Sequence, residues 1–181
     1  MKKIIADETA VARQLDRLAC EILERHPDLN TFCLVGIKTR GAYIAQRLQA
    51  RIEKLCGTKP ALGELDITLY RDDLTQVADD PQMKSTALGT DINGKIVILA
   101  DDVLYSGRTI LCALAALKQF GKPGKVEFLT MIDRGHHTLP VCADFVGRTV
   151  HTEADDIIHV HLKERDGDDM IVHNVGGQNE R

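Results

Sequence analysis

Two adjacent carboxylates, Asp101 and Asp102, follow an apolar run and precede a loop rich in groups that bind oxyanions. The apolar run spans 95–100, and the loop 103–109 reads Val-Leu-Tyr-Ser-Gly-Arg-Thr. The two carboxylates can accept hydrogen bonds from ribose hydroxyls. The N–H groups of the loop and of a helix that begins after it can receive a phosphate. This stretch therefore predicts a site for a sugar phosphate.

The side chains of the loop also suit a phosphate. Gly107 allows the main chain to approach an oxyanion closely. Ser106 and Thr109 supply hydroxyl groups, and Arg108 supplies a fixed positive charge. The sequence lacks the Gly-x4-Gly-Lys-Ser/Thr pattern of a Walker loop and the Gly-x-Gly-x-x-Gly pattern of dinucleotide sites. The loop therefore belongs to another phosphate-binding type.

Alternating strands and helices are predicted around this loop, which indicates an α/β fold with a parallel sheet. Three amphipathic stretches predict helices over 8–25, from about 41 to 55, and over 109–120, the first capped by Asp7 or Thr9. Apolar or alternating runs predict strands over 31–37, 62–71, 95–100, 126–132, 157–162 and 170–173.

Three polar loops follow predicted strands and would meet at one edge of the sheet. They are Lys38–Gly41, Asp101–Thr109 and Asp133–His136. Ligands of parallel sheets bind at the carboxyl ends of the strands, so this coincidence favours a composite site. The polar stretch 72–91 has little periodicity, and a loop of that length is usually functional or mobile.

Composition is that of a globular protein, with 44% hydrophobic and 28% charged residues in a chain of 181. We expect one domain over 1–175 and a disordered tail over 176–181. The net charge of -4 means that any nucleic-acid site must be a local basic face. We expect a cytoplasmic protein without membrane contact, because the sequence has no signal peptide and no long apolar run. The five scattered cysteines indicate free thiols.

Three histidines near the end of the chain raise the question of a metal site. His159 and His161 alternate along one predicted strand, and His173 lies in the next. No cysteine or carboxylate spacing completes a zinc site around them, so no resident metal is predicted.

The segment Val97–Thr109 resembles the phosphoribosyl-diphosphate (PRPP) signature of the type I phosphoribosyltransferases. Other blocks narrow the resemblance to the PyrR family of pyrimidine-operon attenuation proteins that are also uracil phosphoribosyltransferases. It extends from the first predicted helix to about Val172. The blocks, in the family's order, are Leu34–Gly41, Gly63–Asp73, Asp101–Arg108 and Ile132–His136.

The resemblance implies the type I phosphoribosyltransferase fold, a parallel sheet flanked by helices with a small hood and a mobile loop. It also implies a reaction in which uracil and PRPP give UMP and diphosphate, with Mg²⁺ carried by the PRPP diphosphate. Asp101 and Asp102 would hold the ribose hydroxyls, and Arg71 would close over the diphosphate as a catalytic residue. The other implied contacts are Val103, Leu104, Tyr105, Ser106, Gly107, Arg108 and Thr109 to the 5′-phosphate, Thr39 and Arg40 to the diphosphate, and Arg134 and the main chain near Ile158 to uracil.

Simpler interpretations stay open for three of the arginines. Arg40 can be a plain surface charge, and Arg134 can form a local ion pair with Asp133. Arg71, beside two aspartates, can belong to a solvated loop.

The family also implies a partner, the leader mRNA of the pyrimidine operon, bound through a basic face in response to UMP. Candidate RNA contacts are Arg17, Arg25, Lys38 and Arg148. Four residues depart from what the family leads us to expect on that face: Asp16, Cys20, His137 and Cys142. We therefore predict that catalysis is retained and that RNA binding is weak or absent.

Two other functions remain open at this point. One is an RNA-binding regulator that uses the PRPP fold mainly as a nucleotide sensor. The other is a phosphoribosyltransferase for a different base, such as a purine. The resemblance also implies a homo-oligomer, a dimer or higher.

Overall fold

The structure, a computed structural model, describes residues 2–70 and 88–176. Residue 1, the segment 71–87 and the segment 177–181 lie outside the described residues. Arg71, most of the polar stretch 72–91 and nearly all of the expected tail therefore fall outside the description.

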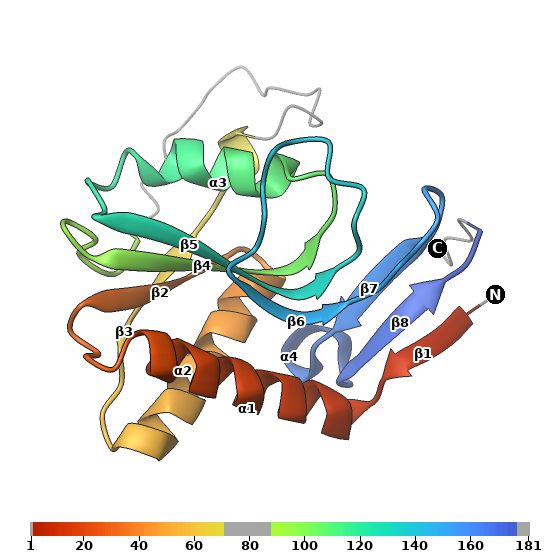
Figure 1. Ribbon diagram of the computed structural model, residues 1–181, viewed down its shortest axis with the longest axis horizontal. Helices are drawn as coiled ribbons and strands as arrows, with labels where there is room; N and C mark the ends of the chain where they lie inside the picture. Colours follow the sequence, from red (N-terminus) through yellow and green to blue (C-terminus); the bar gives the residue numbers. More distant parts are fainter. Residues whose placement is uncertain (1, 71–87, 177–181) are drawn as a thin grey trace.

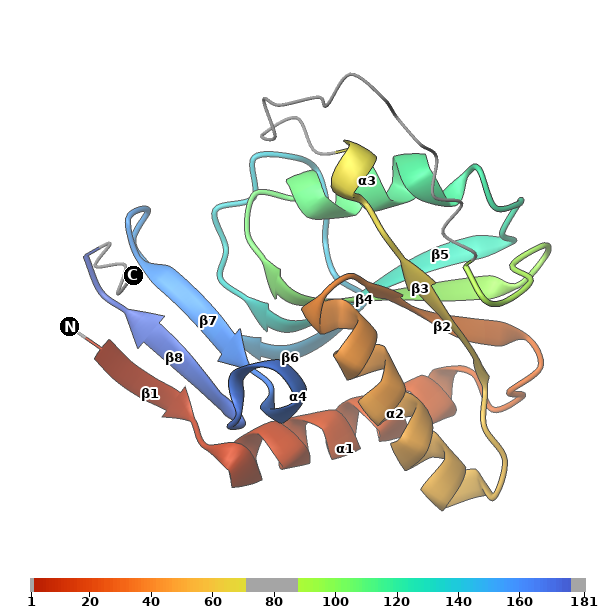
Figure 2. The ribbon, with the colours of Figure 1, turned by 180° about the vertical axis from the view of Figure 1, so that it is seen from behind.

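A five-stranded parallel sheet forms the centre of the molecule, and helices cover both of its faces (Figure 1). Helix α3 (Arg108–Leu117) lies on one face, and helices α1 (Glu8–Arg25) and α2 (Arg40–Cys56) lie on the other, as Figure 2 shows from behind. The strands in spatial order are β3 (Ala61–Leu65), β2 (Phe32–Ile37), β4 (Ile96–Leu104), β5 (Lys125–Asp133) and β6 (Phe145–Thr149).

The apolar character of the central strands explains this arrangement. Every residue of β2 is buried, because both faces of the sheet are covered. One apolar cluster joins the sheet to α1 and α2, and a second joins it to α3. In α1, Val11, Leu15, Leu18 and Ile22 form the buried stripe, and the Asp7 side chain caps the helix by accepting the Ala10 N–H at 2.8 Å.

A smaller antiparallel sheet, here called the hood, stands beside the main sheet (Figure 1). It contains β1 (Lys2–Ala6), β8 (Met170–Asn174) and β7 (Ile157–His161), in that order. The short helix α4 (Lys163–Asp166) joins β7 to β8, and β7 contacts β4 of the main sheet. The chain termini of the described part both lie at the hood.

Three sequence predictions need correction. The strand predicted over 62–71 ends at Leu65, because the Asp66 carboxylate accepts the Thr68 N–H at 3.0 Å and starts a 3-10 turn over Thr68–Tyr70. The strand predicted to end at Ala100 continues to Leu104. Strands β1 and β6 were not predicted, because β1 begins with two lysines and β6 contains Gly147 and Arg148, so neither shows a continuous apolar or alternating run.

Candidate functional site

The start of α2 packs directly against the end of β4, and glycines make this approach possible. A Cβ atom on Gly41 would overlap the Ala100 carbonyl oxygen, and one on Gly36 would overlap the main chain of Ala42. The loop 38–41 is therefore held beside the acidic pair that follows Ala100. Two of the three predicted loops meet here for this reason.

The acidic pair lies inside β4, at its carboxyl end, and not after the strand as the sequence suggested. Asp101 pairs in register with Thr130 of β5 and is only 7% exposed. The Asp101 carboxylate accepts the Asp102 N–H at 3.0 Å, and the Asp102 carboxylate accepts the Val103 N–H at 2.9 Å. The strand therefore fixes both carboxylates in place before any ligand binds.

Burial raises the pKa of Asp102, while the positive charge of Arg40 and hydrogen bonds to the carboxylate act in the opposite direction. A carboxylate in this position gains from a nearby cation or from hydroxyl donors. The hydroxyls of a ribose can supply such donors.

The loop after β4 ends at the N-terminus of α3. Gly107 caps the helix in a left-handed conformation, with φ of 90°, which glycine adopts without a steric penalty. The Ser106 carbonyl accepts N–H groups from Thr138 and Leu139, at 3.2 and 3.1 Å, so the loop is bonded to the segment that follows β5. Arg108 is exposed at the first position of the helix. The loop therefore ends at the N-terminus of a helix, where N–H groups without intrahelical partners can receive an anion.

Arg134 connects this loop to a third segment. Its guanidinium group lies over the ring of Tyr105, 4.1 Å from the centroid. Its Nε donates to the Thr152 hydroxyl at 3.1 Å, and Nη2 donates to the Glu153 carbonyl at 2.9 Å. Asp133 instead pairs with His137 at 2.8 Å, and the described residues show no ion pair between Asp133 and Arg134.

The Ile158 side chain is 7% exposed and packs in the core, so the predicted contact with a base would have to involve its main chain. It lies in β7, the hood strand that contacts β4.

Arg40 pairs with the hood and is not a plain surface charge. Its Nη2 lies 2.8 Å from Oδ1 of Asp166, and its Nε lies 3.3 Å from Oδ2. Thr39, which precedes it, makes no side-chain capping bond and keeps its hydroxyl available. Sequence reasoning missed Asp166, because the residue sits in a short polar turn without a motif.

Two of the three hood histidines pair with carboxylates, and His159 lies edge-on to the His161 ring, with centroids 6.5 Å apart. His161 lies 3.1 Å from Asp168, and His173 lies 2.7 Å from Asp156. Burial lowers the pKa of His159, as do His161 and Arg40, while Asp102 raises it. Within residues 2–70 and 88–176, no three His, Cys, Asp or Glu residues are grouped closely enough to hold a metal ion.

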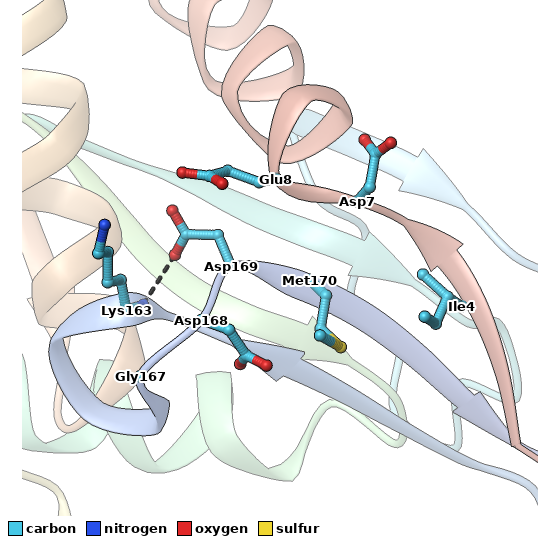
Figure 3. A pocket seen from close by; sticks show the side chains of 8 residues that line it. All are labelled: Ile4, Asp7, Glu8, Lys163, Gly167, Asp168, Asp169 and Met170. Atoms are coloured by element: carbon cyan, nitrogen blue, oxygen red, sulfur yellow. Dashed lines mark hydrogen bonds between the residues drawn. The ribbon is translucent and has the colours of Figure 1, made fainter.

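A cavity of about 310 Å³ lies between the hood and the start of α1 (Figure 3). Asp7 and Glu8 line it from α1, and Asp168 and Asp169 line it from the hood, with Lys163 as its single cationic residue. This excess of carboxylates repels phosphate groups, so the cavity is unsuited to PRPP.

Three of the candidate RNA residues lie along the seam between α1 and β6. Arg17 donates to the carbonyls of Val146 and Gly147, and the Arg25 guanidinium lies 4.2 Å from the ring centroid of Phe145. Arg148 donates to the Ile5 carbonyl. Lys38 instead lies 3.8 Å from Glu64, at the end of β3.

Among the residues that depart from the family's basic face, Asp16 pairs with Arg51 of α2 at 2.8 Å. Its charge is therefore partly neutralised within the protein. Cys20 and Cys142 are exposed free thiols. None of the helices in the described ranges is long and apolar enough to cross a membrane.

Comparisons with known proteins agree with this geometry. Residues 1–165 match the phosphoribosyl transferase domain family. The bifunctional protein PyrR of Elusimicrobium minutum is 54% identical over 171 residues, which cover 94% of this chain and 96% of the relative. The bifunctional protein PyrR of Clostridioides difficile is 45% identical over 94% of this chain and 96% of its own length.

Solved structures show the same fold at low sequence identity. A hypoxanthine phosphoribosyltransferase from Staphylococcus aureus superimposes with a TM-score of 0.70 at 19% identity, over 96% of this chain and 92% of the other. Together with the sheet order and the acidic pair at the end of β4, these matches show that the chain belongs to the PyrR family of phosphoribosyltransferases.

Proposed function

We propose that the protein is a uracil phosphoribosyltransferase of the PyrR type, which converts uracil and PRPP to UMP and diphosphate. The observation that carries this proposal is the convergence of three groups at one edge of the sheet. These are the acidic pair of β4, the N-terminus of α3 behind Gly107, and the Thr39–Arg40 turn at the start of α2. They match the ribose, the 5′-phosphate and the diphosphate of PRPP.

The reaction breaks the bond between C1 of the ribose and the diphosphate oxygen, and the electron pair leaves with the diphosphate. N1 of uracil forms the new bond to C1, and its proton is lost. Positive charge develops on the ribose as the bond breaks, as in glycoside chemistry. Asp101 and Asp102 hold the hydroxyls of that ring and place negative charge beside it.

The diphosphate leaves toward the start of α2. Thr39 offers a hydroxyl and Arg40 a guanidinium group, and the first N–H groups of the helix are free of intrahelical partners. Mg²⁺ bound to the diphosphate would neutralise part of its charge. Arg71 is proposed to act on the diphosphate, and it lies outside the described residues.

The base is proposed to lie between the hood and the Arg134 segment. The main chain at Ile158 can hydrogen-bond the edge of a pyrimidine, and Arg134 borders the same space through its stacking on Tyr105.

A base screen tests the catalytic proposal. Uracil, hypoxanthine, guanine and adenine are each incubated with PRPP and Mg²⁺, and diphosphate release is measured. Release with uracil alone supports the proposal. Release with a purine alone would replace the proposal with transfer to a purine. Purines are included in the screen because a hypoxanthine phosphoribosyltransferase shares this fold.

A second function is proposed from the seam between α1 and β6, namely UMP-dependent binding of the pyrimidine leader mRNA. Arg17, Arg25 and Arg148 gather there, and salt-dependent contacts of such groups with phosphates would supply the affinity. Because Cys20 and Cys142 depart from the residues expected on the basic face of the family, we expect weak RNA binding. A gel shift with the leader hairpin, with and without UMP, measures it, and tight UMP-stimulated binding would refute that expectation.

The protein is also proposed to form a homo-oligomer, a dimer or higher, and to consist of a single domain over 1–175. Sedimentation at several concentrations tests the first point.

A further inference from the structure

Arg40 is the first residue of α2, yet its side chain turns toward the hood. Asp166, the last residue of α4, meets it with both carboxylate oxygens, at 2.8 Å from Nη2 and 3.3 Å from Nε. A two-point contact of this kind fixes the plane of the guanidinium group as well as its position.

Asp166 is itself held rigidly. Its Oδ2 accepts the Leu162 N–H at 2.9 Å, and its own N–H donates to the Leu162 carbonyl at 2.7 Å. Burial would raise the pKa of the carboxylate, but the Leu162 N–H and Arg40 outweigh this, and the pKa lies below its usual value. The carboxylate is therefore ionised at neutral pH and cannot rotate away without losing a main-chain bond.

The pairing leaves much of the guanidinium group available. Arginine has five N–H donors, and Asp166 engages one on Nε and one on Nη2. Arg40 pairs with Asp166 of the hood, and its neighbour Gly41 lies against the main chain of Ala100 and Asp101, so Arg40 lies between the acidic pair and the hood. Its remaining donors are in the region where the diphosphate of PRPP is proposed to bind.

We propose that Asp166 is a positioning residue that holds the Arg40 guanidinium ready for the diphosphate of PRPP. The hood thereby takes part in PRPP binding through a residue that does not touch the substrate. The proposal rests on the proposed function of Arg40. It implies that the Asp166 carboxylate remains on Arg40 when PRPP binds, because an anion on each edge of the guanidinium satisfies different donors.

Competition between Asp166 and the diphosphate for Arg40 would change the affinity for PRPP in the opposite direction. If the Asp166 carboxylate competed with the diphosphate for the same donors, its removal would free Arg40 and strengthen PRPP binding. The direction of the change in affinity therefore decides between positioning and competition.

The test is Asp166→Asn, which can keep the bond from the Leu162 N–H but loses the charge that orients Arg40. We expect KM for PRPP to rise about tenfold, with kcat and KM for uracil changed by less than about twofold. Arg40→Lys keeps the charge without the planar fork and is expected to give a similar rise.

Asp169→Asn is the matched control. Asp169 lies in the same hood turn and pairs with Arg47, also on α2, at 2.7 Å. It also accepts the Lys163 N–H at 2.7 Å (Figure 3). Its substitution is expected to lower the melting temperature and to leave KM for PRPP unchanged. An equal rise in KM for PRPP in this control would overturn the proposal, because it would show a general effect of hood stability.

A double-mutant cycle completes the test. In an Arg40→Ala background, Asp166→Asn should have no further effect on PRPP affinity, measured by calorimetry without uracil. Additive effects, or unchanged or tighter PRPP binding in the single Asp166→Asn variant, would overturn the proposal. Because PRPP binding is measured directly, a wild-type protein that binds PRPP but forms no UMP would refute the uracil function alone.

Discussion

The guanidinium group of Arg134 lies 4.1 Å from the centroid of the Tyr105 ring, and this contact joins the loop between β4 and α3 to the segment after β5. The ring of His136 meets the same tyrosine edge-on, with centroids 6.0 Å apart. Two loops that are distant in sequence are thus fastened together at the border of the proposed base site. Binding of the 5′-phosphate at one loop is therefore expected to order the groups that meet the base.

Replacement of Tyr105 tests this connection. Tyr105→Ala removes the ring that supports Arg134, and we expect kcat/KM for uracil to fall about tenfold, since a cation–π contact is worth about 1–2 kcal/mol when partly desolvated. Tyr105→Phe keeps the ring and loses only a long hydroxyl contact of 3.5 Å with the Ala154 carbonyl, so it should retain activity. Steady-state kinetics decide, and equal losses in both variants would contradict the stacking role.

Asp102→Asn tests the acidic pair. The substitution changes only the charge of a side chain whose pKa burial raises, so folding should survive while the ribose loses its charged acceptor. We expect kcat to fall by about a hundredfold or more, as for other charge-stabilising groups.

Asp144→Asn serves as the control for Asp102→Asn. Asp144 accepts the Phe128 N–H at 2.9 Å and precedes β6, away from the carboxyl ends of the strands. It should affect stability but not turnover. Full activity of Asp102→Asn would show that the carboxylate does not hold the ribose.

The stability of the hood should fall at low pH, because the Asp156 carboxylate becomes protonated. N–H groups of Glu153 and Gly176 and the ring of His173 bond its carboxylate and lower its pKa from 3.8 to about 2. A pKa that is lower in the folded state contributes stability that is complete above 3.8 and is lost as the pH falls through about 2.

Urea unfolding of the wild type and of Asp156→Asn between pH 5 and pH 2 measures this contribution. The variant should be less stable at pH 5, and its stability should fall less steeply than that of the wild type on acidification. Parallel curves for the two proteins would show that Asp156 titrates alike in the folded and unfolded states.

Gln14 of α1 offers a test of packing. Its side chain is buried, and within the described structure neither its Oε1 nor its Nε2 has a hydrogen-bond partner. An unpaired buried amide costs about 1–3 kcal/mol, so Gln14→Leu should raise the free energy of unfolding by roughly 1 kcal/mol.

Gln49→Leu is the control for Gln14→Leu, because the Gln49 amide donates to the Pro60 carbonyl at 2.8 Å. Its substitution should be destabilising. Chemical denaturation measures both changes, and a loss of stability in Gln14→Leu would mean that its amide has a partner after all.

Much of the fold follows from local patterns. The apolar stripe of α1 predicts a helix, because a helix buried on one face repeats its apolar residues every three or four positions. The unbroken apolar run of β2 predicts a strand that is buried on both faces. The candidate phosphate site at 103–109 can be predicted in the same way, since Gly107 and its neighbours are adjacent in the chain. Strands β1 and β6 are not evident, because neither has an apolar or alternating run and each is stabilised by pairing with a strand beside it in space.

By itself, the sequence determined the α/β class, the acidic pair and the glycine-containing loop that follows it, all of which depend on neighbouring residues. Only the tertiary structure decided which groups share the site. Arg40 and its partner Asp166 are 126 residues apart, and Arg134 meets Tyr105 across two strands of the sheet. Such contacts depend on the packing of the hood against α2 and on the register of β4 with β5. Neither the packing nor the register is encoded in any single stretch of chain.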